Sequence, residues 1–388
     1  MQIFEDDKKY IAGTYARFEL DLVKGKGSLI QDSNGKEYID LGTGIGVNLF
    51  GVADEEWRNA VTDQLSKIQH TSNLYYNEPC IKLAELLCKR TGMSKIFFSN
   101  SGAESNECAI KAARKYSAEN NGADYYKIIT LWNSFHGRTL TDLAATGQDH
   151  YHELFQPLTP GFLHANQDIN EIEKLCSENK TAAIMIECIQ GEGGVIPLDK
   201  KFADDLKKFL EAHKNILLVI DEVQTGNGRT GKLFSYEHFG FKPDIATTAK
   251  GIGGGLPIGV TMLSEKLKDV FKPGDNGSTF GGNPVVCAGA CNILNRIDEK
   301  LLSEVTRKGE MLRNMLVNSK GIDDVAGIGL MLGIKPKNKK ASDVVKACIN
   351  DGVLCLTAKD RIRLLPAVNI PEDLLKRAGE VIIKACEA

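Results

Sequence analysis

The chain has 388 residues, in which 48 Lys and Arg stand against 51 Asp and Glu, for a net charge of −3. A balance this close to neutral offers no electrostatic basis for binding nucleic acid. Charged residues interrupt every apolar run before it reaches the length of a membrane span, so we expect no membrane segment. The length is sufficient for two domains.

The opening residues, MQIFEDDKKY, lack the basic and apolar regions of a secretion signal. The ten cysteines include no CxxC pair, and most lie in apolar surroundings, which is typical of free buried thiols in a reducing compartment. Cys287 and Cys291 are four positions apart, but no neighbouring His or Cys completes a zinc set. We therefore expect a cytoplasmic protein without a metal site.

The N-terminal quarter begins with a small antiparallel unit. Alternating strands flank Asn34-Gly35 within residues 1–45, which predicts a hairpin. The glycine-rich segment 42–51 does not fit the spacing of a dinucleotide-binding loop. Two amphipathic helices are predicted over 55–70 and 79–91. The polar and aromatic residues between them form a loop.

A strand over Lys95–Phe98 leads into Ser101-Gly102-Ala103 and a helix that runs to about residue 120. Small residues at the start of a helix leave backbone N–H groups accessible at the positive end of the helix dipole, where a phosphate can bind. A plain serine cap explains the same residues and is the commoner use of such a sequence. Both interpretations stay open at this point.

Two further strands, Lys127–Leu131 and Ala182–Glu187, each lead into a loop with polar residues. The first loop, WNSFHGRT, contains Phe135, which could be a core residue, and His136, which could be a histidine satisfied within the turn. His150 and His152 have metal-like spacing without a third ligand, and we interpret them as surface residues. Taken alone, Glu192 after the second strand is a solvated loop acid.

The segment from Asn215 to Pro257 carries the strongest chemical signal. A buried strand, Ile216–Ile220, ends in Asp221, and a second strand, Asp244–Thr248, is followed by Lys250 and a glycine-rich run. Ligands of open α/β sheets bind at the carboxyl ends of the strands. A lysine there can form a Schiff base with an aldehyde, and a nearby carboxylate can keep a pyridine nitrogen protonated. Taken alone, each residue has a simpler explanation: Asp221 could cap a helix, and Lys250 could be a surface charge.

The segments IDEVQTGNGRTG and PDIATTAKGIGGGLPIG resemble the class III aminotransferases of fold type I, nearest to their acetylornithine branch. The resemblance covers nearly the whole chain and implies an α/β fold: a mostly parallel, seven-stranded sheet with helices on both faces, plus a smaller α+β domain. The large domain is expected over 46–284, and 1–45 and 285–388 together are expected to form the small one. The chain departs from the family pattern at Ala16-Arg17, at Val52-Ala53-Asp54 and at Cys188.

By resemblance, the cofactor is pyridoxal 5'-phosphate, and Lys250 is the catalytic lysine that holds it and moves the proton. Asp221 is expected on the ring nitrogen, Phe135 and Val223 on the two ring faces and Gln224 on the ring hydroxyl. The phosphate is expected to lie on the turn formed by Ser101, Gly102 and Ala103. The same resemblance implies a homodimer with shared sites, in which Thr279 reaches the partner's phosphate; a serine- and threonine-rich cap for the following helix is the alternative role of its segment. It also implies that the His70–Pro79 segment crosses to the partner's site, with an ordinary loop as the equal alternative.

For substrates, the resemblance implies that Arg138 grips a carboxylate and that Glu192 pairs with Arg363 as a switch, with Ser278 and Asn73 as further contacts. The implied reaction moves the distal amine of N-acetylornithine to 2-oxoglutarate through a pyridoxamine form, in arginine biosynthesis. Ornithine, succinylornithine, N-succinyldiaminopimelate and 4-aminobutyrate stay open as donors. A mutase or decarboxylase on the same scaffold also stays open, as does a non-enzymatic regulator that binds the cofactor.

Overall fold

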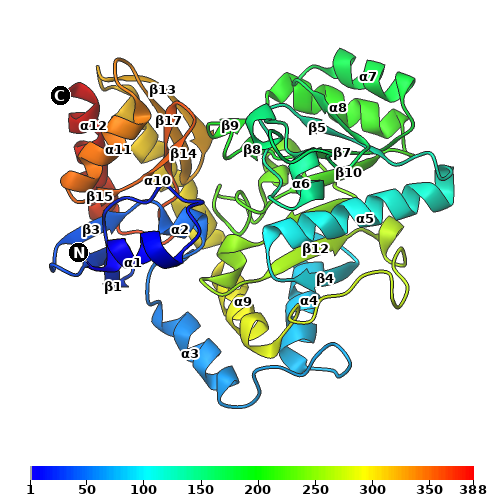
Figure 1. The fold of residues 1–388 in the computed structure, drawn as a ribbon, viewed down its shortest axis with the longest axis horizontal. Coiled ribbons are helices and arrows are strands. Elements are labelled where there is room, and N and C mark those ends of the chain that lie inside the picture. Colours follow the sequence, from blue (N-terminus) through cyan, green and yellow to red (C-terminus); the bar gives the residue numbers. More distant parts are fainter. Residues whose placement is uncertain (1) are drawn as a thin grey trace.

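A seven-stranded sheet forms the centre of the larger part of the molecule, in strand order β4-β12-β11-β10-β7-β5-β6 (Figure 1). The computed structural model describes residues 2–388. The strands are β4 (Lys95–Ser99), β5 (Lys127–Leu131), β6 (Phe162–Ala165), β7 (Thr181–Ile186), β10 (Leu217–Asp221), β11 (Ile245–Thr248) and β12 (Gly259–Leu263). Only β12 runs against its neighbours. The expected mostly parallel α/β fold is confirmed.

Helices cover both faces of this sheet because its central strands are apolar on both sides. In β10, Leu217 and Val219 share a hydrophobic cluster with the apolar side chains of α5 (Gly102–Asn121). Their neighbours Leu218 and Ile220 belong to the main core, which includes side chains of α7 (Ile169–Glu178) and α8 (Lys200–Ala212). Alternate strand residues therefore serve opposite helix layers.

The second part of the molecule gathers the two ends of the chain, drawn in blue and in orange to red in Figure 1. Strand β15 pairs in parallel with β3 and so joins a C-terminal strand to the N-terminal hairpin. The two small sheets contain β1 (Leu22–Lys26), β2 (Leu29–Asp32), β3 (Glu37–Asp40) and β15 (Val353–Leu354), and β13 (Ile322–Ile328), β14 (Met331–Pro336), β17 (Arg361–Leu364) and β16 (Leu356–Ala358). Helices α10 (Glu299–Val317), α11 (Ala341–Asn350) and α12 (Glu372–Glu387) pack on them.

Helix α9 (Pro284–Arg296) packs against α3 (Glu55–Leu65) and α4 (Glu78–Thr91), at the bottom of Figure 1. The first helix of the C-terminal segment to pack on the small sheets is α10. The domain limits at residues 46 and 284 stay a prediction. The remaining elements are α2 (Thr43–Gly46), α6 (Leu140–Ala145), β8 (Ile189–Gln190), β9 (Ile196–Pro197) and the 3-10 turns η1 (Asp149–Tyr151), η2 (Ser235–Phe239), η3 (Lys250–Gly253) and η4 (Glu265–Leu267).

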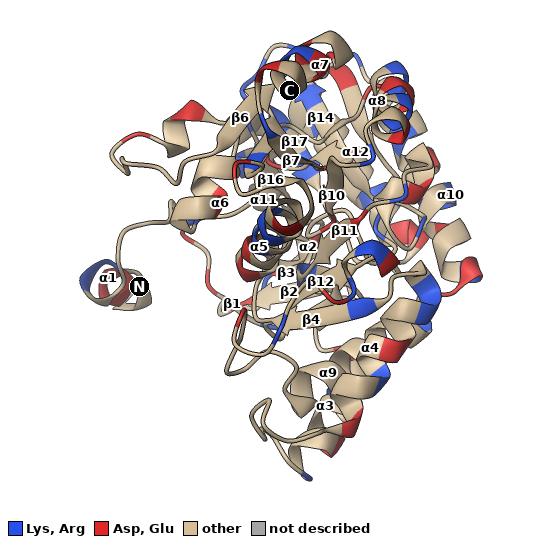
Figure 2. Cartoon of the chain, turned by 90° about the vertical axis from the view of Figure 1, so that its right-hand side faces the viewer, with Lys and Arg blue, Asp and Glu red and all other residues tan. Residues whose placement is uncertain are grey.

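Three elements differ from the sequence-based expectation. Helix α3 ends at Leu65 rather than near residue 70, since Ser66 caps it. The apolar run 325–334, whose composition predicts a single short strand, is a hairpin, because Gly329 turns the chain with φ of 57°. An unexpected helix, α1 (Gln2–Tyr10), has no buried residue and stands away from the body of the chain in Figure 2.

Figure 2 also shows acidic and basic residues interspersed along the visible helices rather than separated into stretches of one sign. Within residues 2–388, no helix is both long enough and apolar enough to cross a bilayer.

Candidate active site

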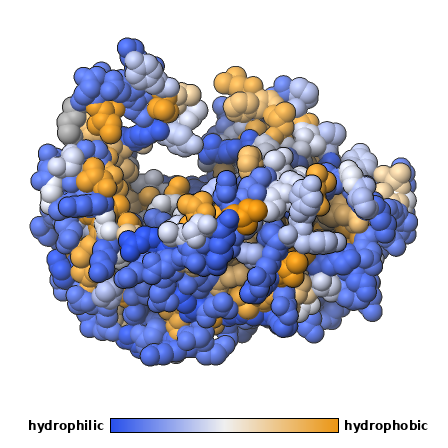
Figure 3. Space-filling view, turned by 90° about the horizontal axis from the view of Figure 1, so that it is seen from below, coloured by the Kyte–Doolittle hydropathy of each residue, from blue (hydrophilic) through white to orange (hydrophobic). Residues whose placement is uncertain are grey.

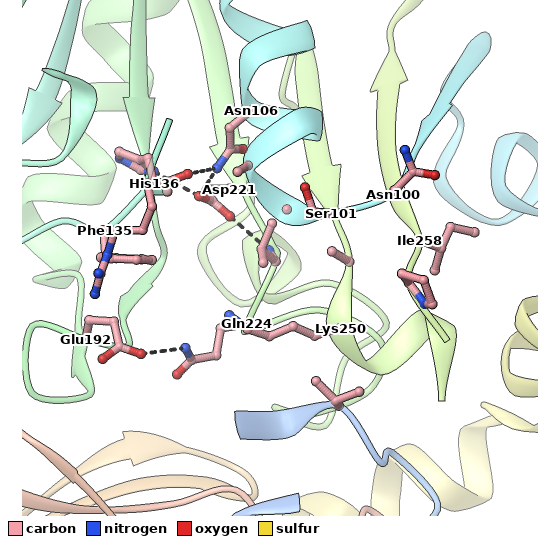
Figure 4. A pocket seen from close by; sticks show the side chains of 18 of the residues that line it. Asn100, Ser101, Asn106, Phe135, His136, Glu192, Asp221, Gln224, Lys250 and Ile258 are labelled. Atoms are coloured by element: carbon pink, nitrogen blue, oxygen red, sulfur yellow. Dashed lines mark hydrogen bonds and ion pairs between the residues drawn. The ribbon is translucent and has the colours of Figure 1, made fainter. Parts of the chain in front are cut away.

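A cavity of about 450 Å³ lies at the carboxyl edge of the large sheet, where loops from several strands meet (Figure 4). Ten of the residues singled out in the sequence line it. They are Ser101, Gly102, Ala103, Phe135, Arg138, Glu192, Asp221, Val223, Gln224 and Lys250. The parallel strands bring these residues together because their carboxyl ends point to the same edge.

Asp221 ends β10 and is almost fully buried, yet each of its carboxylate oxygens accepts hydrogen bonds. Oδ2 lies 2.9 Å from Nδ1 of His136 and 2.8 Å from Nδ2 of Asn106, and Oδ1 accepts from the backbone N–H of Val223 at 2.9 Å. The hydroxyl of Thr247 donates to the Asn106 side-chain oxygen at 2.7 Å and so fixes which way the amide faces. This network, at the top of Figure 4, fixes the orientation of the Asp221 carboxylate.

His136 and Asn106 were not recognised from the sequence. They lie 85 and 115 residues from Asp221 in the chain, and no local spacing connects them to it. The expectation that His136 is satisfied within its own turn is wrong, because its Nδ1 binds Asp221.

Lys250 follows β11, which neighbours β10 in the sheet. Its backbone has φ of 48°, a left-handed conformation that a lysine adopts only at some energetic cost. Loss of hydration in the cavity lowers the pKa of its amine, and the negative charges of Asp221 and Glu192 oppose that change in part. A lowered pKa favours the neutral, nucleophilic form of the amine.

Ser101 caps α5, and its Oγ accepts a hydrogen bond from the backbone N–H of Glu104 at 3.1 Å. The cap therefore exists, and it leaves the first N–H groups of the helix at the cavity wall. Gly102 is required here, because a Cβ at this position would lie 2.6 Å from Cγ1 of Val223. The contact seats Val223 directly under the helix start.

Glu187 follows β7, lies buried and accepts backbone hydrogen bonds from Phe135 at 2.8 Å and from Gly191 at 3.2 Å. Burial raises the pKa of this carboxyl to about 7. The side chain ties the Phe135 loop to the loop after β7, so it fixes two walls of the cavity. Sequence patterns did not single it out.

Glu192 forms an ion pair with Arg363 of β17, which brings the smaller part of the molecule to the cavity. Gln224 lies between them: its Oε1 accepts from Arg363 at 3.2 Å and its Nε2 lies 3.5 Å from Glu192 Oε1. Figure 4 shows Glu192 and Gln224 facing each other at the lower end of the cavity. The expected contact of Gln224 with a ring hydroxyl stays a prediction.

Arg138 is exposed at the cavity mouth. Its guanidinium carbon lies 5.4 Å from the centre of the Phe135 ring and 4.5 Å from that of Tyr151. Tyr151 also was not recognised from the sequence. The interpretation of its neighbour His152 as a surface residue is wrong, because this half-buried ring binds the backbone oxygens of Leu143 and Thr146.

Four predicted residues do not line the cavity within one chain: Arg363, which reaches it through Glu192, and Thr279, Ser278 and Asn73. Thr279 is exposed. The side chain of Asn73 donates to the backbone oxygens of Ser278 and Gly281 at 2.9 and 3.0 Å. Ser278 in turn accepts a hydrogen bond from Asn100, a residue of the cavity wall, at 3.1 Å. The predicted roles of Thr279, Ser278 and Asn73 stay predictions.

The cavity fits pyridoxal phosphate in its size and in the chemistry at each end. A lysine with a lowered pKa stands near a buried carboxylate that is hydrogen-bonded on both oxygens. The helix start at Ser101 offers backbone donors for a phosphate. Phe135 and Val223 line the same cavity with flat or branched apolar groups. These are the groups that an aldehyde, a pyridine nitrogen, a phosphate and an aromatic ring require.

Known proteins resemble the chain over almost its whole length. The family model "Aminotransferase class-III" matches residues 10–386. An acetylornithine aminotransferase of Haemophilus ducreyi is 47% identical over 384 residues, covering 98% of this chain and 97% of the relative. One of Caldanaerobacter subterraneus subsp. tengcongensis is 42% identical, covering 97% of each chain.

Solved structures agree with this assignment. The ornithine aminotransferase of Toxoplasma gondii has a TM-score of 0.95 at 31% identity, covering 99% of this chain and 94% of that one. The N-acetylornithine aminotransferase of Stenotrophomonas maltophilia has a TM-score of 0.84 at 32% identity, covering 98% of each. The chain thus belongs to the class-III aminotransferases and is a pyridoxal-phosphate-dependent enzyme of fold type I.

Proposed function

We propose that this enzyme transfers the distal amino group of N-acetylornithine to 2-oxoglutarate, giving N-acetylglutamate 5-semialdehyde and glutamate, in arginine biosynthesis. The observation that carries the proposal is that one of two arginines has an acidic partner and the other has none. Glu192 neutralises Arg363, whereas no carboxylate among residues 2–388 pairs with Arg138. Relatives named acetylornithine aminotransferase support the choice of donor.

The two arginines suit two substrates that differ by one carboxylate. N-acetylornithine carries one carboxylate, which Arg138 binds with two parallel hydrogen bonds, and its distal amine enters past the closed Glu192–Arg363 pair. 2-Oxoglutarate and glutamate carry two carboxylates. When Glu192 moves away, Arg363 binds the second of them. One cavity thus accepts both substrates in turn.

The other predicted residues take roles that follow from their places. The N–H groups at Ser101, Gly102 and Ala103 hold the phosphate, and Asp221 faces the ring nitrogen. When bound, the cofactor supplies an electron sink for the carbon that loses its proton. Lys250, with its lowered pKa, accepts that proton and returns it. His136 and Asn106 hold the Asp221 carboxylate in place.

A homodimer is part of the proposal. Leu74, Tyr75 and Tyr76 are exposed by 87, 71 and 96%. Phe280, whose ring centre lies 5.6 Å from that of His70 in the same loop as those three residues, is exposed by 62%. Figure 3 looks from below at the end that carries α3 and α4, and apolar side chains gather there in patches between hydrophilic ones. Contiguous exposed apolar groups mark an interface. We infer that a second copy covers this surface and that Thr279, next to Phe280 in the chain, then reaches the partner's site.

Ornithine transamination is the second candidate, since the Toxoplasma ornithine aminotransferase has the higher of the two TM-scores, 0.95 against 0.84. Steady-state rates with acetylornithine, succinylornithine, ornithine and 4-aminobutyrate, each paired with 2-oxoglutarate, separate the candidates. We expect the highest kcat/KM with acetylornithine. A higher value with ornithine would replace the proposed donor. Cytoplasmic location and the two-domain limits remain predictions.

A further inference from the structure

Arg138 is held by aromatic rings rather than by an acid. Its guanidinium carbon lies 4.5 Å from the centre of the Tyr151 ring and 5.4 Å from that of Phe135. The two rings meet edge to face, with centres 5.7 Å apart and planes at 66°. Among residues 2–388, no carboxylate forms an ion pair with Arg138. The positive charge is therefore attracted to the ring faces.

Tyr151 reaches this position because its segment is tied to the start of the Arg138 loop. Tyr151 is the last residue of η1, which begins directly after Gln148. The side chain of Gln148 donates to the backbone oxygen of Ser134 at 2.9 Å. On the other side, His152 binds the backbone oxygens of Leu143 and Thr146 at 2.9 and 2.7 Å, at the end of α6. Hydrogen bonds of Gln148 and His152 thus anchor the chain on both sides of Tyr151.

An aromatic support has a consequence that an acidic support lacks. A carboxylate partner occupies the in-plane N–H groups of a guanidinium, and an incoming substrate must then displace it. A ring contacts only the face of the guanidinium and leaves those N–H groups available. Arg363 is the opposite case, because the Glu192 carboxylate already binds its guanidinium.

We propose that Tyr151 is a positioning residue for substrate binding: its ring holds the guanidinium of Arg138 in the orientation that receives a substrate carboxylate. The inference rests on the proposed function, in which Arg138 is the carboxylate-binding residue. The ring is the active part, since the Tyr151 hydroxyl forms no hydrogen bond within the described residues. Proton transfer at Lys250 is a separate step, so loss of the ring affects KM more than kcat.

The experiment compares Tyr151→Leu and Tyr151→Phe in the holoenzyme, with acetylornithine as the varied substrate. For Tyr151→Leu we expect KM to rise roughly 3- to 30-fold with a small change in kcat, the range that follows from the strength of a cation–π contact. Tyr151→Phe keeps the ring and is expected to keep KM within about twofold of the wild type. Tyr126→Leu is the matched control, because Tyr126 supports Arg114 in the same way at 5.9 Å, away from the cavity.

Two further variants distinguish the possible failures. Arg138→Ala should raise KM steeply by itself, and adding Tyr151→Leu to it should raise KM no further, because the ring acts through the arginine. If Arg138→Ala leaves KM unchanged, the proposed substrate clamp is wrong. If Arg138→Ala raises KM but Tyr151→Leu does not, or if Tyr151→Phe is as damaging as Tyr151→Leu, the positioning role is overturned.

Discussion

Glu192, which lines the cavity, forms an ion pair with Arg363 although the two lie 171 positions apart in the chain. Arg363 is almost fully buried, and its charge has no other carboxylate partner among residues 2–388. Opening the pair therefore leaves a buried guanidinium that keeps its hydrogen bond to Gln224 but whose charge is balanced only when a substrate carboxylate enters. Whether Arg363 pairs with Glu192 or with a substrate carboxylate therefore depends on which substrate enters.

Replacing Glu192 by Gln tests that dependence. The variant keeps the size of the side chain but removes the charge, so Arg363 is available to glutamate from the start. We expect the ratio of kcat/KM for glutamate to kcat/KM for acetylornithine to rise roughly ten- to hundredfold, the range set by one hydrogen bond to a charged group. Single-turnover rates with each donor measure the ratio. Glu173→Gln, an exposed acid on α7, is the control, and an unchanged ratio in Glu192→Gln would remove the switch.

Lys250→Ala is expected to abolish covalent attachment of the cofactor while leaving the fold and the phosphate seat in place. The helix start at Ser101 and the network around Asp221 do not use the lysine, so non-covalent binding should persist. Borohydride reduction followed by mass spectrometry of the peptide containing residue 250 measures attachment. A cofactor adduct on another lysine of the variant would contradict the assignment. The rate of amino transfer should fall by roughly 10²–10⁴, the range for a positioned proton-transfer group.

The placement of Asp221 and Lys250 at one cavity could be predicted from the sequence because it depends on strand ends alone. Each residue follows an apolar strand, and β10 and β11 prove to be parallel neighbours, with Asp221 level with Thr247. Side chains at the ends of adjacent parallel strands necessarily lie close together. For the same reason, the phosphate turn after β4 and the Phe135 loop after β5 fall at one edge.

The contacts that hold these site residues in place could not be predicted, because they arise from packing between segments that are distant in the chain. Asn106 faces Asp221 only once α5 lies across the sheet, and Tyr151 reaches Arg138 only after the chain passes through α6. Periodicity says which face of α5 is buried but not which strand end that face meets. Thr279 lies outside the cavity for a different reason: its predicted role requires a second chain.

The exposed apolar surface around Tyr76 leads to a prediction on assembly. Replacing Tyr76, which is 96% exposed, by Asp places a charge in the proposed interface. We expect the variant to shift from dimer towards monomer in light scattering and to bind cofactor more weakly, since in the proposed dimer Thr279 of a second chain completes the phosphate site. Leu154→Asp is the matched control, because Leu154 is 98% exposed but lies on the loop that follows η1. A Tyr76→Asp protein that remains dimeric with full cofactor affinity would place the interface elsewhere.

Asp142 gives a prediction on pH and stability. It lies in α6 with no exposed surface, and neither carboxylate oxygen has a hydrogen-bond partner within residues 2–388. Burial, with the nearby charge of Glu107 as a second cause, raises the pKa of this carboxyl to about 9. In the unfolded chain an aspartate has a pKa of about 3.9. Between these two values the folded protein holds one proton more than the unfolded chain.

Because the folded state binds the extra proton, raising the pH through this window destabilises it, by up to about 1.4 kcal/mol of unfolding free energy per pH unit. Asp142→Asn has no such proton to lose. The unfolding free energy of Asp142→Asn minus that of the wild type should therefore be lowest near pH 5 and increase towards pH 8.5. Urea unfolding at each pH measures this difference. Glu178→Gln, an exposed acid on α7, should show no such trend. Parallel pH profiles for Asp142→Asn and the wild type would mean that the carboxyl is charged in the folded protein and that polar groups or water stabilise it there.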